Sequence, residues 1–400
     1  MENITKILFG LFIMFAAAKG MGELFERIKQ PAVVGEILAG ILLGPYILNL
    51  VEPSHFYNVL AEIGVIILLF TVGLQIGVDE LLLVGKTSLI VAVLGVIFPF
   101  IFGFLYAQII AHTTVEAMFV GAVMVATSVG ITARVLADLR ILNAKVSKVI
   151  LGAAVFDDII GLIVLAIVTG LGKGAISYLK IGLVIFEALA FVLFLIFIGK
   201  RVVPYVAPGL KVFKTRNAPF SLAILLCLGL SVVASYIDLA AIIGAFMAGM
   251  VLSGLNIEFR LSLKTESLYD FLVPFFFVVM GMKVDLSVFT QIHIIGAALL
   301  LTLFAILGKL LGCGLGALGL GLRDASIVGV GMVPRGEVGI IIASIGLSMG
   351  AIGADLYSVV IFMVVATTLL TPPVLRKMIL KSDSLKRVGE EMAEKAGAPE

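Results

Sequence analysis

The stretch LGAAVFDDIIGLIVLAIVTG (151–170) is predominantly apolar, but two adjacent aspartates, Asp157 and Asp158, lie near its centre. It is long enough to cross the hydrocarbon core of a bilayer as one helix. A carboxylate at that depth costs at least about 2.5 kcal/mol, and no lysine or arginine lies on the same stretch. Such carboxylates normally face a water-filled cavity and mark an ion or proton path. The alternative is a buried pair that a neighbouring helix satisfies.

The composition of the whole chain indicates the same environment. Of its 400 residues, 61% are hydrophobic and only 14% are charged, with a mean hydropathy of +1.22. Soluble domains carry about 25% charged residues. The two cysteines, Cys227 and Cys313, lie inside apolar segments, which favours packing over a disulfide or a metal site. The sequence therefore predicts an all-α polytopic membrane protein and excludes a soluble domain.

Apolar runs between Pro, Gly and charge clusters predict about thirteen transmembrane helices. Their expected limits are 4–24, 31–48, 59–76, 87–111, 115–138, 145–171, 176–199, 218–236, 238–255, 268–284, 288–319, 324–349 and 355–375. With this count, lysine and arginine gather in the loops after odd-numbered spans and in the C-terminal tail. The positive-inside rule then places the N-terminus outside and the C-terminus in the cytoplasm of a multi-pass cell-membrane protein. Residues 381–400 are expected to form a short charged cytoplasmic tail.

Three segments recur in the same order later in the chain. VGEILAGILLG from Val34 resembles IGAFMAGMVLSG from Ile243, and LFTVGLQIGVDEL from Leu69 resembles FFVVMGMKVDL from Phe276. VGAVMVATSVGI likewise resembles VGVGMVPRGEVGI. The offset skips seven spans, so the second copy is inverted in the membrane and the seventh span connects the two. Inverted repeats are typical of alternating-access transporters, whose ion sites lie near the midplane.

Two corresponding spans contain helix-breaking residues at mid-depth. ATSVGIT (126–132) and VPRGEVG (333–339) interrupt apolar runs, and Pro334 removes a backbone donor while Gly336 tolerates unwound geometry. The ends of broken helices can coordinate a cation through carbonyls and attract carboxylates through N–H groups. The sequence thus predicts an ion site beside two interrupted helices.

Five ionisable side chains are expected at membrane depth: Asp157, Asp158, Lys309, Arg335 and Glu337. Adjacent helical residues point about 100° apart, so one aspartate can face a cavity while the other faces a partner helix. Lys309 lies in LFAILGKLLG, whose flanking glycines permit close helix contact, and its obvious partner is one of the aspartates. Arg335 and Glu337 are expected to be structural charges that neutralise the half-helix ends and each other.

The chain resembles the cation:proton antiporter superfamily, specifically its second family, which includes NapA-type sodium/proton antiporters. The matching motifs are QPAVVGEILAGILLGP, LLFTVGLQ, ATSVGIT, AAVFDDIIGL, GKLLG and VPRGEVG. The resemblance covers residues 4–378, essentially the whole membrane part.

This resemblance implies an NhaA-like fold with crossed broken helices and a homodimer in the bilayer. Spans 1–3 and 8–10 (about 4–76 and 218–284) would form the dimerisation part. Spans 4–6 and 11–13 (about 87–171 and 288–375) would form a moving core, with span 7 (about 176–199) as linker. The membrane transporter domain would thus occupy residues 1–380.

The resemblance also implies the roles of individual residues. Asp158 would bind the transported ion and the proton directly, Asp157 would pair with Lys309, and Thr127 and Ser128 would supply further oxygen ligands. The aspartate pair is typical of electrogenic members of the family. The expected activity is exchange of sodium or lithium for protons, with Asp158 and Asp157 as the Na⁺ ligands, no cofactor, no nucleic-acid partner and no enzymatic reaction.

Other functions remain open from the sequence. Potassium/proton exchange is the first alternative, because both cations are hard and take oxygen ligands. Potassium-efflux relatives commonly carry Gln at the first aspartate position and a nucleotide-binding domain, neither of which this sequence shows. An intramembrane aspartyl protease needs two aspartates on facing helices, which adjacent positions on one helix cannot provide. A passive channel would require a continuous polar stripe.

Overall fold

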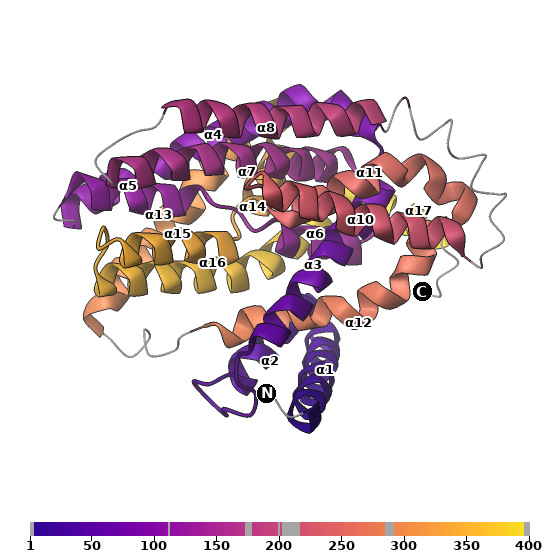
Figure 1. The fold of residues 1–400 in the computed structure, drawn as a ribbon, viewed down its shortest axis with the longest axis horizontal. Helices are drawn as coiled ribbons and strands as arrows, with labels where there is room; N and C mark the ends of the chain where they lie inside the picture. The colour runs from indigo at the N-terminus through magenta and orange to yellow at the C-terminus, as the bar shows by residue number, and fades with distance from the viewer. Residues whose placement is uncertain are drawn as a thin grey trace.

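The computed structural model describes residues 4–110, 113–172, 178–198, 201, 217–284 and 292–395. All secondary structure in these residues is helical (Figure 1). The helices are α1 (Ile4–Arg27), α2 (Ala32–Leu43), α3 (His55–Gln75), α4 (Val78–Ile110), α5 (Thr114–Val125), α6 (Val129–Asp138), α7 (Lys145–Gly172), α8 (Tyr178–Phe197), α10 (Ala218–Tyr236), α11 (Ala241–Phe259), α12 (Leu261–Met282), α13 (Ile292–Gly316), η4 (Leu318–Leu320), α14 (Leu322–Gly331), α15 (Glu337–Ser348), α16 (Ala354–Leu380) and α17 (Asp383–Lys395).

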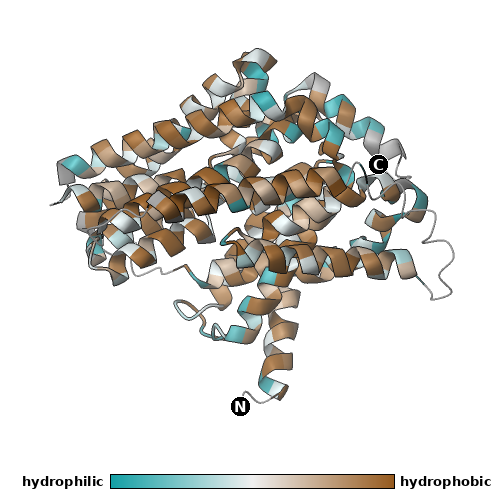
Figure 2. Ribbon diagram, turned by 45° about the horizontal axis from the view of Figure 1, so that its top comes forward, coloured by the Kyte–Doolittle hydropathy of each residue, from teal (hydrophilic) through white to brown (hydrophobic). Residues whose placement is uncertain are grey.

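The lengths and composition of these helices confirm an all-helical membrane protein. Within the described residues, 9 helical segments are long and apolar enough to cross a bilayer. Shorter apolar helices coincide with α2, α8, α11 and α15. Hydrophobic residues dominate the long helices, and hydrophilic ones gather toward helix ends (Figure 2).

Several expected helix limits are wrong because helices continue past the apolar run. α4 begins at Val78 rather than 87, and its first turn carries Asp79 and Glu80. Acidic side chains at a helix N-terminus are favourable, and Glu80 also pairs with Lys148 at 2.9 Å. α12 likewise begins seven residues early, and α16 runs on to Leu380. Hydropathy reports only the part of a helix that lies in hydrocarbon.

The helices pack in two groups. In the first, here called the panel bundle, α3 packs against α11 and α12, α12 packs against α1 and α2, and α10 packs against α11. In the second, the core bundle, α4 packs against α5, α7 and α13, α13 packs against α14 and α16, and α15 packs against α5 and α16. α8 contacts α7 of the core bundle and α11 of the panel bundle. α3 and α6 form part of the boundary between the two bundles.

Glycines allow the closest helix contacts in both bundles. A Cβ atom on Gly40 of α2 would lie 2.0 Å from the Val278 carbonyl oxygen of α12. In the core bundle, a Cβ on Gly312 of α13 would lie 2.3 Å from the Leu94 oxygen of α4, and one on Gly308 would lie 2.9 Å from Pro99 Cα. Small residues that let backbones approach are typical of membrane helix interfaces. The close helix contact expected around Lys309 is therefore confirmed, and α4 is the partner.

The C-terminal tail contains a helix that the sequence analysis did not predict. α17 follows α16 directly, and its Leu385 is buried. A Cβ on Gly389 would lie 3.0 Å from the Leu139 carbonyl oxygen, in the connection between α6 and α7. Charged composition alone suggested a solvated tail, but its few apolar residues fall on one face and pack against the core bundle.

We expect Gly40→Ala to lower the free energy of unfolding by about 1–3 kcal/mol, because its new methyl group must push two backbones apart. Gly20→Ala, in α1, is the matched control. Among the described residues outside the neighbouring turns of α1, no atom lies within 4 Å of the position that its new Cβ would occupy, so this substitution should be neutral or slightly stabilising. Thermal unfolding of both purified variants in detergent measures the difference. Equal stability of the two would show that the α2–α12 contact is looser than described.

Candidate functional site

Two interrupted helices cross at the centre of the molecule. The break between α5 and α6 spans 126–128, and the break between α14 and α15 spans 332–336. The Ser128 amide donates a hydrogen bond to the Pro334 carbonyl at 2.8 Å. A Cβ on Gly336 would lie 2.6 Å from Ser128 Oγ, so no larger residue fits there without displacement. The predicted breaks are confirmed, although each is shorter than its motif.

Polar atoms at this crossing are buried without partners. Thr127 and Ser128 are 6% and 4% exposed, and neither hydroxyl oxygen has a hydrogen-bond partner among the described residues. Thr132, one turn further along α6, is by contrast satisfied, because its hydroxyl donates to the Gly331 carbonyl at 2.6 Å. Buried hydroxyls are usually hydrogen-bonded, so each exception needs an explanation. Two unpartnered hydroxyl oxygens at a helix break can accept a hard cation.

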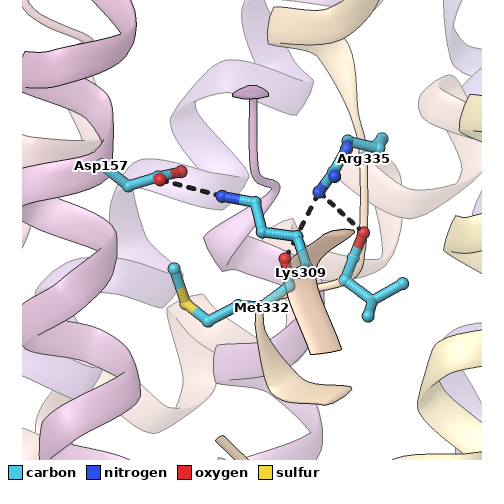
Figure 3. A network of polar contacts seen from close by, with 5 residues as sticks. Asp157, Lys309, Met332 and Arg335 are labelled. Atoms are coloured by element: carbon cyan, nitrogen blue, oxygen red, sulfur yellow. Dashed lines mark hydrogen bonds and ion pairs between the residues drawn. The ribbon is translucent and has the colours of Figure 1, made fainter. Parts of the chain in front are cut away.

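Asp157 and Lys309 form a fully buried ion pair between α7 and α13. Lys309 Nζ lies 2.8 Å from Asp157 Oδ1, and the lysine and aspartate side chains are 0% and 2% exposed. Figure 3 shows the lysine extended toward the carboxylate. From the sequence alone, either aspartate could be the partner of this lysine, and the family resemblance implied Asp157. In the structure the partner is Asp157. Both residues belong to the core bundle.

Asp158 faces a different environment from Asp157. It is partly buried and lines a cavity of about 10 Å³, room for about one water-sized particle. Leu69 of α3, Val129 of α6 and Phe246 of α11 line the same cavity. Asp158 therefore lies where the core bundle meets the panel bundle. One aspartate faces a partner helix and the other faces a cavity, as the helical geometry predicted.

Arg335 lies at the second break and is 0% exposed. Its Nη1 donates to the carbonyl oxygens of Val333 at 3.0 Å and Met332 at 3.4 Å, just beyond the end of α14 (Figure 3). The hydroxyl of Thr368 in turn donates to the Arg335 carbonyl. A cation at the C-terminal end of a half-helix is electrostatically favourable. The side chain of Glu337 lies outside the described residues, so its predicted pairing with Arg335 is not tested.

Two larger cavities lie at opposite ends of α3, each between the bundles. One, of about 540 Å³, is lined by Asn58, Glu62 and Ile242, and Ile242 also lines the Asp158 cavity. The other, of about 350 Å³, is lined by Gln75 and by Asp138 at the end of α6. The Asp158 cavity thus lies between two wider, partly polar cavities.

Sequence reasoning missed two buried charges. Glu36 on α2 is 2% exposed and Arg134 on α6 is 8% exposed, and neither is among the five ionisable residues expected at membrane depth. Glu36 sits alone within VVGEILAG, and its isolation in an apolar run was the available signal. Arg134 was grouped with the lysines and arginines of the loops, because the sequence does not show that the short half-helix after the break is buried.

The geometry agrees with what comparison with known proteins shows. The profile described as "sodium/hydrogen exchanger, transmembrane" matches residues 11–381. The chain belongs to this family. It is 36% identical to the Na⁺/H⁺-K⁺ antiporter GerN of Bacillus cereus over 373 residues, covering 92% of this chain and 95% of GerN. It is 35% identical to the high-affinity Na⁺/H⁺ antiporter NhaS3 of Synechocystis, covering 93% and 90%.

The fold of this exchanger is similar to a solved structure. The sodium proton antiporter MjNhaP1 from Methanocaldococcus jannaschii superposes with a TM-score of 0.65 at 19% identity, covering 99% of this chain and 98% of that chain. At this identity the likeness concerns the fold alone. The resemblance to cation:proton antiporters, drawn from the motifs, is confirmed by the family match.

We expect Lys309→Gln to destabilise the protein by about 3–5 kcal/mol, because it leaves Asp157 buried without its cation. The double variant Asp157→Asn/Lys309→Gln removes both charges and should recover much of that loss. Thermal unfolding in detergent at one pH compares the two variants with the wild type. A double variant as unstable as Lys309→Gln would mean that packing of the lysine stem, and not its charge, stabilises the core.

Proposed function

We propose that this protein is a secondary active antiporter that exchanges sodium, or lithium, for protons by alternating access. The observation that carries the proposal is the position of Asp158. It faces the cavity between the two bundles, while Asp157 is held by Lys309 within one of them. Family membership supports the reaction, and relatives along nearly the full length are named Na⁺/H⁺ antiporters.

In this proposal the cation and the proton compete for the same carboxylate. Ionised Asp158 binds Na⁺ together with the hydroxyl oxygens of Thr127 and Ser128, and Asp157 contributes when it leaves Lys309. Protonation of Asp158 removes the negative charge that holds the cation, and bound cation disfavours protonation. This competition alone couples the two fluxes, so no separate gating ligand, cofactor or catalytic residue is required.

Movement of the core bundle against the panel bundle would expose the site to each side in turn. The panel bundle corresponds to the proposed dimerisation part, the core bundle to the moving part, and α8 to the linker. We further propose thirteen spans related by inverted repeats in an NhaA-like arrangement, a homodimer in the cell membrane, and a cytoplasmic C-terminus. The crossing of the two breaks and the separate packing of the bundles support this arrangement.

Potassium/proton exchange is the second candidate, because the name of GerN includes K⁺ as well as Na⁺. Proton flux in sealed proteoliposomes, with each cation added in turn, separates the candidates. Release of the proton gradient by Na⁺ or Li⁺ but not K⁺ supports the sodium proposal. A protease would need a second aspartate facing the first, whereas Asp157 faces a lysine.

Asp158→Asn should abolish exchange while the protein still folds, because the amide neither titrates nor binds Na⁺ as a carboxylate does. The matched control is Asp355→Asn, an exposed aspartate at the start of α16. Dequenching of a pH dye in proteoliposomes measures both. Near-normal exchange by well-folded Asp158→Asn would remove Asp158 from the ion site.

Apparent sodium affinity should tighten as pH rises, until the competing carboxylate is fully ionised. The sign follows from competition: protons occupy the site at low pH, and each pH unit below the operating pKa weakens binding by up to about tenfold. Binding isotherms of the purified protein at several pH values test this directly. An affinity that stays flat across the active pH range would require a proton site separate from the sodium site.

A further inference from the structure

A buried ion pair connects the two bundles. Arg134 Nη2 on α6 of the core bundle lies 3.6 Å from Glu36 Oε1 on α2 of the panel bundle. By contrast, the Glu80–Lys148 pair and the Asp157–Lys309 pair each join helices within the core bundle. The Arg134–Glu36 contact must therefore change whenever the bundles move relative to each other.

Arg134 has a second partner on the panel bundle and a third on its own helix. Its guanidinium carbon lies 5.0 Å from the ring centroid of Tyr269 on α12, a cation–π contact. Its Nε lies 3.1 Å from Asp138 Oδ1, one turn along α6. If α6 moves, Asp138 moves with it, so Arg134 keeps one carboxylate partner when it leaves the panel. Separating Arg134 from Glu36 then costs less free energy than leaving a buried guanidinium with no carboxylate partner.

The geometry of the Arg134–Glu36 pair is also poorer than that of a strong, permanent ion pair. Its 3.6 Å separation is longer than a charge-assisted hydrogen bond, which is typically about 2.7–2.9 Å. Glu36 Oε2 and Arg134 Nη1 are buried with no hydrogen-bond partner among the described residues. Buried ion pairs stabilise a fold only when the geometry is excellent and the remaining atoms are satisfied. This contact suits a pair that forms and breaks during the cycle.

Arg134 lies between the ion site and one of the two wide cavities. Along α6, Val129 lines the Asp158 cavity and Asp138 lines the 350 Å³ cavity, with Arg134 between them in sequence. Along α3, Leu69 lines the Asp158 cavity and Val72 lines the 350 Å³ cavity. The 350 Å³ cavity is on the side of α17, which packs against the connection after α6. Tyr269, which contacts the Arg134 guanidinium, also lines the 350 Å³ cavity, so the Arg134 contacts border the wide cavity on the α17 side.

We propose that Arg134, held by Glu36 and Tyr269, is an ionic latch that closes the ion site toward the α17 side. Opening to that side requires the guanidinium to leave both panel residues while it keeps Asp138. The latch rests on the proposed alternating-access function, because it assigns one closed state of that cycle to one contact. Neither Arg134 nor Glu36 is among the residues proposed to bind the transported ion.

The test measures access to Leu69→Cys, a buried α3 position that lines the Asp158 cavity. A membrane-impermeant maleimide is applied from the α17 side of vesicles whose orientation is fixed by protease access to a C-terminal tag. The native Cys227 and Cys313 are 0% exposed and serve as the unreactive background. Adding Glu36→Gln should raise the labelling rate from the α17 side at least about fivefold. Labelling from the opposite side should fall.

The control removes an ion pair within one bundle. Lys148→Gln breaks the Glu80–Lys148 contact of the core bundle and should leave the labelling rate unchanged. Tyr269→Leu is a second latch variant, which removes only the cation–π contact and should raise labelling by a smaller factor. It keeps the proposal testable if Glu36→Gln folds poorly. Unchanged labelling in both folded latch variants, or an equal rise in Lys148→Gln, would overturn the latch.

A reversible bridge provides the converse test. In Glu36→Cys/Arg134→Cys, a short reducible bifunctional thiol reagent should stop exchange, and reductant should restore it. Continued exchange by the fully bridged protein would overturn the latch. Cysteine labelling does not depend on transport. A failure of the latch proposal can therefore be distinguished from a failure of the proposed antiport function. A wild-type protein that labels as expected but does not exchange sodium for protons would overturn the proposed function and leave the latch supported.

Discussion

The buried ion pair between Asp157 and Lys309 constrains the arrangement around it. Burying each charge costs several kcal/mol, which only a close partner offsets, so α7 and α13 must stay together at the 2.8 Å contact. α13 reaches this position because Gly308 and Gly312 let it pack closely on α4, which also packs against α7. Separating these helices would leave the charges of Asp157 and Lys309 without their ion-pair partners. The proposed movement between the bundles, where Asp158 lies, would leave this ion pair intact.

Backbone groups at the crossed helix breaks find hydrogen-bond partners although they lie outside regular helix. Non-helical backbone at membrane depth is tolerated only where protein or a cavity surrounds it. Here the Ser128 amide is satisfied by the Pro334 carbonyl, and Arg335 donates to the carbonyl oxygens of Val333 and Met332. The hydroxyl oxygens of Thr127 and Ser128 have no hydrogen-bond partner among the described residues. Each break thus supports the other, and Gly336 is required because a side chain there would fill the space at Ser128 Oγ.

Hydropathy and helix-breaking residues were enough to predict the helical segments, both breaks and the cluster of Asp157, Asp158 and Lys309, because burying charge in hydrocarbon leaves few alternatives. The same method missed Glu36 and Arg134. A single charge is averaged away in a long apolar window, and the partners of these residues come from distant helices. The early start of α4 and the helix α17 were missed for the opposite reason, since they lie beyond the apolar runs that hydropathy detects. Contacts between the bundles depend on how the helices pack, which no local pattern encodes.

The charges of the core bundle also limit what the proposed exchange can be. With Asp157, Asp158, Lys309 and Arg335 all ionised, these four side chains carry no net charge. Binding one Na⁺ or protonating Asp158 changes that charge by the same amount, so exchange of one for one moves no net charge across the membrane. Electrogenic exchange would then require more than one proton for each Na⁺, so a second titratable group would also have to release a proton in each cycle.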